Sequence, residues 1–248
     1  MNVEAIDRLA AIRERLEHDG RVRVADLATA LGVSEMTIRR DLETLVDEGL
    51  AMRVRGGAVA VGPQPYATRY GQHARAKTVI ADKLVGLVPA GATIALDASS
   101  TIQRLASRLG RARDLTVITN GPDTFRSLVD HPGVEALLTG GAREPRTGSL
   151  VGPLACRAAR DLLASHLIMS AAALDPGLGS SESGLDEAEV KLAFADGADE
   201  VVLAVDSSKL GQRASARAFA LERISLLVTE LDPTDTRLDP YRDHLPLL

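Results

Sequence analysis

The sequence of 248 residues lacks several features on which common protein classes depend. Its single cysteine, Cys156, cannot form a disulfide within the chain, and the amino terminus lacks the basic, apolar and small-residue succession of a signal peptide. No stretch approaches the roughly 18 consecutive apolar residues that a membrane-spanning helix needs. These absences exclude an internal disulfide framework, give a membrane role no support and predict a cytoplasmic location.

An excess of positive charge is also missing. The formal net charge is −5, from 29 lysines and arginines against 34 aspartates and glutamates, which on its own argues against nucleic-acid binding. Net charge averages over domains, however, and DNA binding depends on whether positive side chains cluster on one face. The arginines at positions 39, 40, 53 and 55 lie close together in the sequence, so the average hides a local basic patch.

The composition that remains is that of a globular protein, with 45% hydrophobic and 25% charged residues. The length exceeds that of a domain of about 100 to 150 residues, which favours two domains. Two prolines, Pro63 and Pro65, stand in a stretch without sustained periodicity, as in a linker. We therefore predict a first domain over residues 1–62, a linker over 63–76 and a second domain over 77–248.

The first part of the first domain predicts two helices separated by a minimal strand. Apolar residues recur at helical spacing at Ala5, Leu9, Ile12 and Leu16, and the helix ends at residues 19–20. Residues 21–24 alternate in polarity, as in a short strand, and residues 25–32 have helical composition with a terminal glycine suited to a left-handed conformation.

A third helix follows Ser34, whose side chain can accept a bond from a free backbone N–H of the first turn. If Ile38 lies in the core, the helical period places Leu42, Leu45 and Gly49 on the same inner face. The residues on the outer face are Met36, Arg40, Glu43 and Asp47. Thr37 and Arg39 flank the outer face. Such a helix can enter the major groove, where the planar guanidinium of Arg40 is best placed to bond two acceptors of guanine. Thr37 and Arg39 can equally contact phosphates.

Residues 51–62 alternate in polarity around Gly56 and Gly57 and predict a two-stranded hairpin, or wing. This hairpin carries Arg53 and Arg55 toward the phosphate backbone or the minor groove. The alternative is a solvated amphipathic helix pair, whose arginines merely pair within their own helix, as Arg39 would with Glu43.

The contiguous segment VSEMTIRRDLETLVDEGLAMRVRGGA resembles the N-terminal signature of the DeoR-type transcription regulators. The resemblance implies that Ser34, Thr37, Arg39 and Arg40 lie on a recognition helix, and that Arg53, Gly56 and Gly57 lie in the wing. Arg55 stands where the family often has histidine, which changes a wing contact but not its polarity.

The second domain predicts a mostly parallel sheet with helices on both faces. Six short apolar runs, TIALDA, LTVITN, VEALLTGG, HLIMSAAAL, EVVLAVD and ISLLVTE, alternate with amphipathic stretches. Ligands of such sheets sit beyond the carboxyl ends of the strands. The polar residues found there are Asp97 with Ser99, Ser100 and Thr101; Thr119 and Asn120; Gly140 and Gly141; and Asp206 with Ser207, Ser208 and Lys209.

These residue types fit a phosphorylated, polyhydroxylated ligand. Ser99, Ser100 and Thr101 open a predicted helix, whose free N–H groups favour a phosphate. Lys209 adds a positive charge, and Asp97 can accept bonds from sugar hydroxyls. The alternative is ordinary capping and turn chemistry, because the same residue types favour helix starts and turns.

The resemblance continues through the second half, in KTVIA, TIALDASST, VITN, LTGG, EAEVK and DSSK. It implies an α/β sensor domain similar in fold to ribose-5-phosphate isomerase that responds to phosphorylated sugars. The effector contacts it implies are Asp97, Ser99, Ser100, Thr101, Asn120, Gly140, Gly141, Lys191 and Lys209, with Asp206 in support. The family usually has glycine and then threonine or serine where this chain has Ser99 and Ser100. Lys191 can also simply pair with Glu187 one helical turn away.

Other chemistry finds less support in the sequence. The five histidines are scattered, so we predict no metal, and no nucleotide-binding fingerprint calls for a cofactor. The string DGADE at residues 196–200 is similar to an isomerase loop, but Gly197 is more simply a helix-ending residue. We expect a non-enzymatic repressor that binds operator DNA as a dimer or higher oligomer. The alternatives are a sugar-phosphate isomerase with an appended helical domain, and an interaction scaffold.

Overall fold

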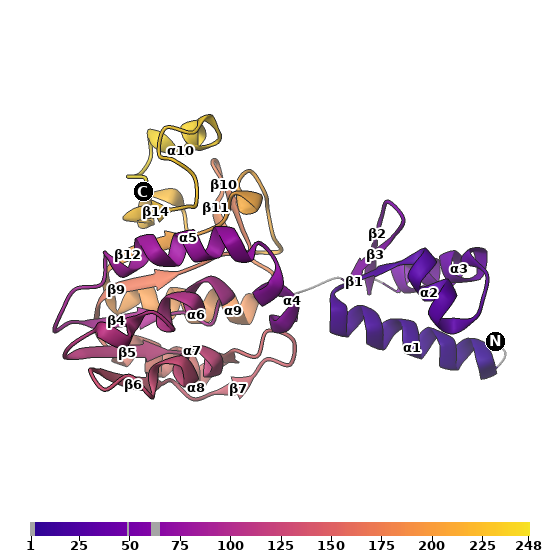
Figure 1. Cartoon of the computed structure of the whole chain (residues 1–248), viewed down its shortest axis with the longest axis horizontal. Coiled ribbons are helices and arrows are strands. Elements are labelled where there is room, and N and C mark those ends of the chain that lie inside the picture. The colour runs from indigo at the N-terminus through magenta and orange to yellow at the C-terminus, as the bar shows by residue number, and fades with distance from the viewer. Residues whose placement is uncertain (1–2, 49, 61–64) are drawn as a thin grey trace. The chain divides into compact units, whose positions relative to one another are not determined.

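The computed structural model describes residues 3–48, 50–60 and 65–248, and its chain divides into two compact units (Figure 1). The first unit is Met1–Arg69 and the second is Tyr70–Leu248. The boundary between them falls inside the predicted linker. Each unit has its own hydrophobic core, and each is described by itself below.

The first unit is a winged helix-turn-helix. Its helices are α1 (Val3–Asp19), α2 (Val24–Leu31) and α3 (Glu35–Asp47), and its strands β1 (Arg21–Arg23), β2 (Ala51–Val54) and β3 (Gly57–Ala60) form an antiparallel sheet in the order β1-β3-β2. The core holds Ile12, Leu16, Leu27, Ile38 and Leu45. The predicted helices, minimal strand and hairpin are all confirmed.

Helix α3 begins and faces as the sequence predicts. Ser34 caps it by accepting a hydrogen bond from the Thr37 N–H at 3.2 Å. Ile38, Leu42 and Leu45 are buried, whereas Met36 is 63% exposed. Gly49, which was expected on the inner face, lies outside the described residues. The amphipathic period therefore fixes which side of α3 is available to a partner.

The predicted linker contains helical structure among its described residues. Helix α4 (Tyr66–Gly71) lies within it, and α5 (Ala74–Val85) begins before its expected end. The Arg69 guanidinium carbon lies 5.5 Å from the centre of the Tyr66 ring, and that of Arg104 lies 4.3 Å from the Tyr70 ring. Such cation–π contacts support a short helix that apolar periodicity cannot reveal.

The second unit is built on a six-stranded parallel sheet. Its strands are β4 (Thr93–Leu96), β5 (Leu115–Thr119), β6 (Val134–Leu138), β9 (Ala164–Met169), β12 (Ala198–Ala204) and β14 (Leu226–Val228). Their order in the sheet is β14-β12-β9-β4-β5-β6, and each neighbouring pair is parallel. All six apolar runs of the sequence thus contribute strands to one sheet, as predicted.

Helices cover both faces of this sheet (Figure 1). On one face α5, α6 (Ser100–Ala106) and α7 (Pro122–Leu128) pack through side chains such as Ile80 and Ile102. On the other face α8 (Pro153–Asp161) and α9 (Leu185–Asp196) pack through side chains such as Phe194. Because successive side chains of a strand point to opposite faces, Ala95 and Leu96 belong to the two different cores.

Several smaller elements were not predicted. Strands β10 (Ala173–Asp175), β11 (Gly179–Glu182) and β13 (Ala216–Arg217) form an antiparallel sheet, and β7 (Ala142–Arg143) pairs with β8 (Leu150–Val151). The run HLIMSAAAL therefore supplies two strands, β9 and β10, rather than one. Helix α10 (Asp239–Arg242) and 3-10 helices at 109–111, 207–209, 221–223 and 236–238 complete the unit. These elements are too short to give a periodic signal.

Among the described residues, no helix combines the length and the apolar character that crossing a membrane would require.

Gly57 is required by close packing between strands of the wing. A Cβ atom at this position would lie 1.9 Å from the Val22 carbonyl oxygen of β1. We expect Gly57→Ala to destabilise the first unit by about 1–3 kcal/mol, because backbone atoms must move apart. The measurement is thermal unfolding followed by circular dichroism. Gly71→Ala is the control, since a Cβ atom there meets nothing within 4 Å; equal melting curves for the two variants would contradict this packing argument.

Candidate DNA-binding surface and ligand site

The outer surface of α3 and the wing carry two kinds of arginine. Arg39 forms an ion pair with Glu35 at 2.9 Å, and Arg53 of β2 forms one with Glu43 of α3 at 2.7 Å. The side chains of Arg40 and Arg55 are exposed and make no hydrogen bond or ion pair within the described part of the chain. The alternative interpretation is that these arginines merely pair with carboxylates of their own helix. This is true of Arg39, which pairs with Glu35 instead of Glu43, but not of Arg40.

The start of α3 is fixed by local hydrogen bonds. The Ser34 and Thr37 hydroxyl oxygens lie 2.9 Å apart, in addition to the capping bond. Arg8 of α1 donates two hydrogen bonds to the Asp41 carboxylate of α3, at 2.6 and 3.1 Å. These bonds fix the first turn of α3 and join α3 to α1, while the side chains of Met36 and Arg40 remain exposed.

In the second unit, the predicted ligand residues come together at one edge of the sheet. Strands β12, β9, β4, β5 and β6 are consecutive neighbours and run parallel, so their carboxyl ends meet at the same edge, about 5 Å apart from strand to strand. The residues that follow these ends are Asp206, Ser170, Asp97, Asn120 and Gly140. The topology thus brings together side chains that are far apart in the sequence.

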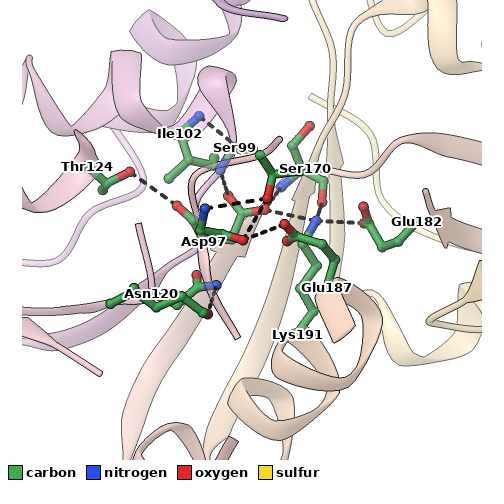
Figure 2. Close-up of polar contacts among 12 residues, drawn as sticks. Asp97, Ser99, Ile102, Asn120, Thr124, Ser170, Glu182, Glu187 and Lys191 are labelled. Carbon is green, nitrogen blue, oxygen red and sulfur yellow. Dashed lines mark hydrogen bonds and ion pairs between the residues drawn. The ribbon is translucent and has the colours of Figure 1, made fainter. Parts of the chain in front are cut away.

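A buried cluster of charges ties this edge together (Figure 2). The Lys191 ammonium of α9 donates to Glu182 of β11 at 2.6 Å and to the Ser170 carbonyl at 2.8 Å, and lies 3.1 Å from Asp97. The Asp97 carboxylate also accepts from the backbone N–H groups of Ser99 and Ser170. All three charged side chains are almost fully buried. The three protons of Lys191 are therefore occupied by acceptors of the protein itself.

The electrostatics of the cluster follow from its burial. Burial raises the pKa of Glu182 from 4.5 to about 7, despite the nearby ammonium, and Glu187 and Asp97 add to the rise. Burial alone would lower the pKa of Lys191, but the carboxylates of Glu182, Asp97 and Glu187 outweigh it and hold this pKa above its ordinary value. The charged lysine is thus stabilised, and Glu182 is a carboxylate that readily takes up a proton.

The three hydroxyl residues after β4 are buried at the start of α6. Ser99 caps this helix by accepting a bond from the Ile102 N–H at 3.2 Å. Its φ of −77° is accessible to any residue, so the backbone does not require the glycine that the family usually has here. Ser100 accepts a hydrogen bond from Lys77 of α5 at 3.1 Å, and Thr101 is buried beside it.

The predicted residues at the ends of β5 and β6 differ in how closely the surrounding protein packs against them and bonds to them. The Asn120 amide donates to the Leu150 carbonyl at 3.0 Å, whereas its side-chain oxygen is buried without a partner among the described residues. A Cβ atom on Gly141 would lie 2.7 Å from the Val151 carbonyl oxygen, so packing against β8 requires this glycine. A Cβ atom on Gly140 would meet nothing within 4 Å.

At the end of β12, Asp206 caps a 3-10 helix with one carboxylate oxygen, while the other oxygen is buried and unpartnered in the described structure. Lys209 ends that helix. The chain has four lysines, and three of them, Lys77, Lys83 and Lys191, donate hydrogen bonds. Lys209 is the one lysine whose ammonium has no partner within the described residues.

Sequence reasoning missed several members of this site. Glu182, Ser170 and Lys77 had no predicted role, because the partners that reveal them are distant in the sequence. The alternative pairing of Lys191 with Glu187 is not found in the described structure: Lys191 pairs with Glu182, and Glu187 accepts a hydrogen bond from Ser149 at 2.5 Å. Gly197, by contrast, ends α9 as predicted.

A winged helix-turn-helix joined to an α/β unit with a polar strand edge defines a DNA-binding protein with a sensor domain. Two family models match the chain: the DeoR-like helix-turn-helix domain over residues 8–64 and the DeoR C-terminal sensor domain over residues 72–231. The chain therefore belongs to the DeoR family of transcriptional regulators, as its sequence signature predicts.

Relatives in this family match over most of their length. The chain is 35% identical to the HTH-type transcriptional regulator GlpR of Haloferax volcanii, over 86% of this chain and 85% of that protein. It is 32% identical to the HTH-type transcriptional repressor GlcR of Bacillus subtilis, over 94% and 91%. Among solved structures, ribose 5-phosphate isomerase A from Neisseria gonorrhoeae aligns over 54% of this chain and 52% of that chain, with 16% identity and a TM-score of 0.39. This last similarity is too low to imply a shared function.

The buried cluster predicts a large effect of removing its only cation. We expect Lys191→Met to destabilise the second unit by about 3–5 kcal/mol, because Asp97 and Glu182 lose the ammonium that compensates their burial. Chemical unfolding of the full chain is the measurement. Leu192→Met, at the exposed neighbouring position of α9, is the control. Adding Glu182→Gln to Lys191→Met should restore part of the loss; a single variant as stable as the control would show that the cluster does not hold this unit together.

Proposed function

We propose that this regulator represses its target genes by inserting α3 into the major groove of operator DNA. The observation that carries the proposal is the exposed Arg40 guanidinium, which alone among the α3 arginines has no ion-pair partner in the described structure. A guanidinium held by no carboxylate is available to bond two acceptors of guanine. Arg39, already paired with Glu35, is better suited to a phosphate contact.

The remaining predicted DNA contacts divide by their geometry. Ser34 and Thr37, at the first turn of α3, can position the helix against phosphates, and the exposed Met36 can contact the bases. Arg55, at the turn of the wing, has no partner in the described structure, which suits a contact with the minor groove or the DNA backbone, whereas Arg53 is paired with Glu43.

The effector that we propose is a phosphorylated sugar bound at the carboxyl edge of the parallel sheet. Within the described part of the chain, the Lys209 ammonium has no partner and can bind a phosphate, and one buried oxygen each of Asn120 and Asp206 can accept hydrogen bonds from hydroxyl groups. Ser99, Ser100, Thr101, Gly140 and Gly141 are the further ligand contacts in this proposal. In this proposal Asp97 and Lys191 hold the strand ends in place, since their polar atoms already engage each other and the backbone.

Control by the effector requires two arrangements of the winged helix-turn-helix units in an oligomer, and the two must differ in their affinity for DNA. We propose a homodimer or higher oligomer in the cytoplasm, because paired heads read repeated half-sites. Effector binding would favour the arrangement that releases DNA, with a coupling of about 1–3 kcal/mol.

The curated relatives are named as transcriptional regulators. A non-enzymatic sensor agrees with the pairing of both Asp97 and Glu182 to Lys191, which leaves neither as an unengaged general base.

The role of Arg40 is tested by mutation. We expect Arg40→Ala to weaken binding to the operator by about 1–3 kcal/mol and to reduce the preference for operator over random duplex, because a base contact is lost. Fluorescence anisotropy with the DNA upstream of its own gene measures both quantities. Arg157→Ala, an exposed arginine of the second unit, is the matched control. Unchanged discrimination by Arg40→Ala would remove this arginine as the base reader, and a wild-type chain that binds no duplex at any salt would refute DNA binding.

The role of Lys209 is tested with ligands. We expect a subset of phosphorylated sugars to raise the melting temperature of the full chain, and the Lys209→Met variant to lose most of this shift, since a phosphate contact disappears. Lys209→Arg should retain part of it. Non-phosphorylated sugars serve as the ligand control. If no phosphorylated sugar stabilises the wild type, or if Lys209→Met responds as the wild type does, the proposed ligand class or its phosphate contact is wrong.

A further inference from the structure

A second group of arginines lies on the first unit, on elements other than α3. These four arginines line a hollow of about 590 Å³ and come from three elements: Arg15 of α1, Arg21 and Arg23 of β1, and Arg55 of the wing turn. Neither the family signature nor the recognition helix accounts for Arg15, Arg21 and Arg23.

The fold explains why these side chains face the same hollow. Val22 of β1 is buried in the core, so the residues on either side of it, Arg21 and Arg23, point away from the core. Strand β1 pairs with β3, with Arg23 opposite Gly57, which places Arg23 beside the wing turn that carries Arg55. Arg15 lies on the last turns of α1, just before the chain enters β1.

The four guanidinium groups are not neutralised by the protein. None of them forms a hydrogen bond or an ion pair in the described part of the chain. Asp19 and Asp26 also line the hollow, but within the described residues no ion pair joins either of them to these arginines, and Asp19 is engaged elsewhere. Elsewhere in the same unit Arg8, Arg39 and Arg53 are each paired with a carboxylate. A set of unpaired guanidinium groups around one hollow is suited to a ligand with several negative charges.

This hollow adjoins the proposed DNA-reading surface at the wing. Gly56 lines it, and Gly56 also lines a smaller hollow between α3 and the hairpin together with Arg39 and Arg53. The basic surface therefore continues from α3, past the wing turn, to β1 and the end of α1. DNA that occupies the first surface has its sugar-phosphate backbone extending in both directions from the bases that α3 reads.

We propose that Arg15, Arg21, Arg23 and Arg55 bind the phosphate backbone of the same DNA duplex, outside the base pairs that α3 contacts. The inference rests on the proposed DNA binding and adds a second site to it. Its contacts are to phosphates, so they contribute affinity and salt dependence without reading sequence. The site lengthens the duplex that each protomer needs for full affinity.

The double variant Arg21→Gln/Arg23→Gln tests this site, because both side chains are exposed and their loss leaves the core intact. The variant should bind the DNA upstream of its own gene and a random duplex of the same length more weakly, by the same factor. The plot of the logarithm of the association constant against the logarithm of salt concentration should become less steep by about 2 for each protomer bound, at about 0.9 per lost phosphate contact. Arg157→Gln/Arg160→Gln removes the same charge from α8 and serves as the control.

Trimming the duplex distinguishes this site from the recognition helix. Removing base pairs beyond those that α3 reads should weaken the wild type to the level of the double variant and leave the double variant unchanged. If the wild type binds DNA and the Arg21→Gln/Arg23→Gln variant binds with the same affinity and the same salt slope, this site is overturned and the proposed function stands. Loss of affinity for the operator alone would also overturn it, because a phosphate contact cannot discriminate. A wild type that binds no duplex would overturn both.

Discussion

The buried ammonium of Lys191 is the constraint on which the sensor unit depends. A charge removed from water is tolerated only where the protein supplies acceptors, and here these come from the end of β4, the end of β9 and strand β11. Asp97 in turn accepts bonds from the backbone of Ser99 and Ser170, so the loop that leads into α6 is fixed as well. One side chain thereby joins the parallel sheet to the small antiparallel sheet.

In contrast to this fully paired cluster, the ligand contacts that we propose are groups with no partner among the described residues. In the sensor unit these are the Lys209 ammonium and single oxygens of Asn120 and Asp206. In the first unit they are Arg40 on α3 and the arginines around the wing, whereas Arg8, Arg39 and Arg53 are held by carboxylates. In both units, ion pairs such as Arg8 with Asp41 and Lys191 with Glu182 join different elements, and we propose that charges with no partner in the described structure are available to ligands.

Much of the fold could be predicted because its signals are local. The period of Ile38, Leu42 and Leu45 gives the buried face of α3, and Ser34 gives its start. The six apolar runs give the strands of the parallel sheet, since buried parallel strands are apolar along their whole length. The antiparallel strands carry no such signal: β11 is Gly-Ser-Ser-Glu, fully buried yet polar, and only its hydrogen bonds to neighbouring strands make it a strand.

The sequence by itself determined α1, α2 and α3, the strands of the parallel sheet, the family and the edge of the sheet at which polar residues gather, because each depends on neighbouring residues or on a contiguous motif. Only the tertiary structure decided which charges are engaged. Lys191 pairs with Asp97 and Glu182 rather than with Glu187 one turn away, and Arg39 pairs with Glu35 while Arg40 has no partner among the residues that the structure describes. Pairing is decided by distance and burial in space, and spacing along the chain specifies neither.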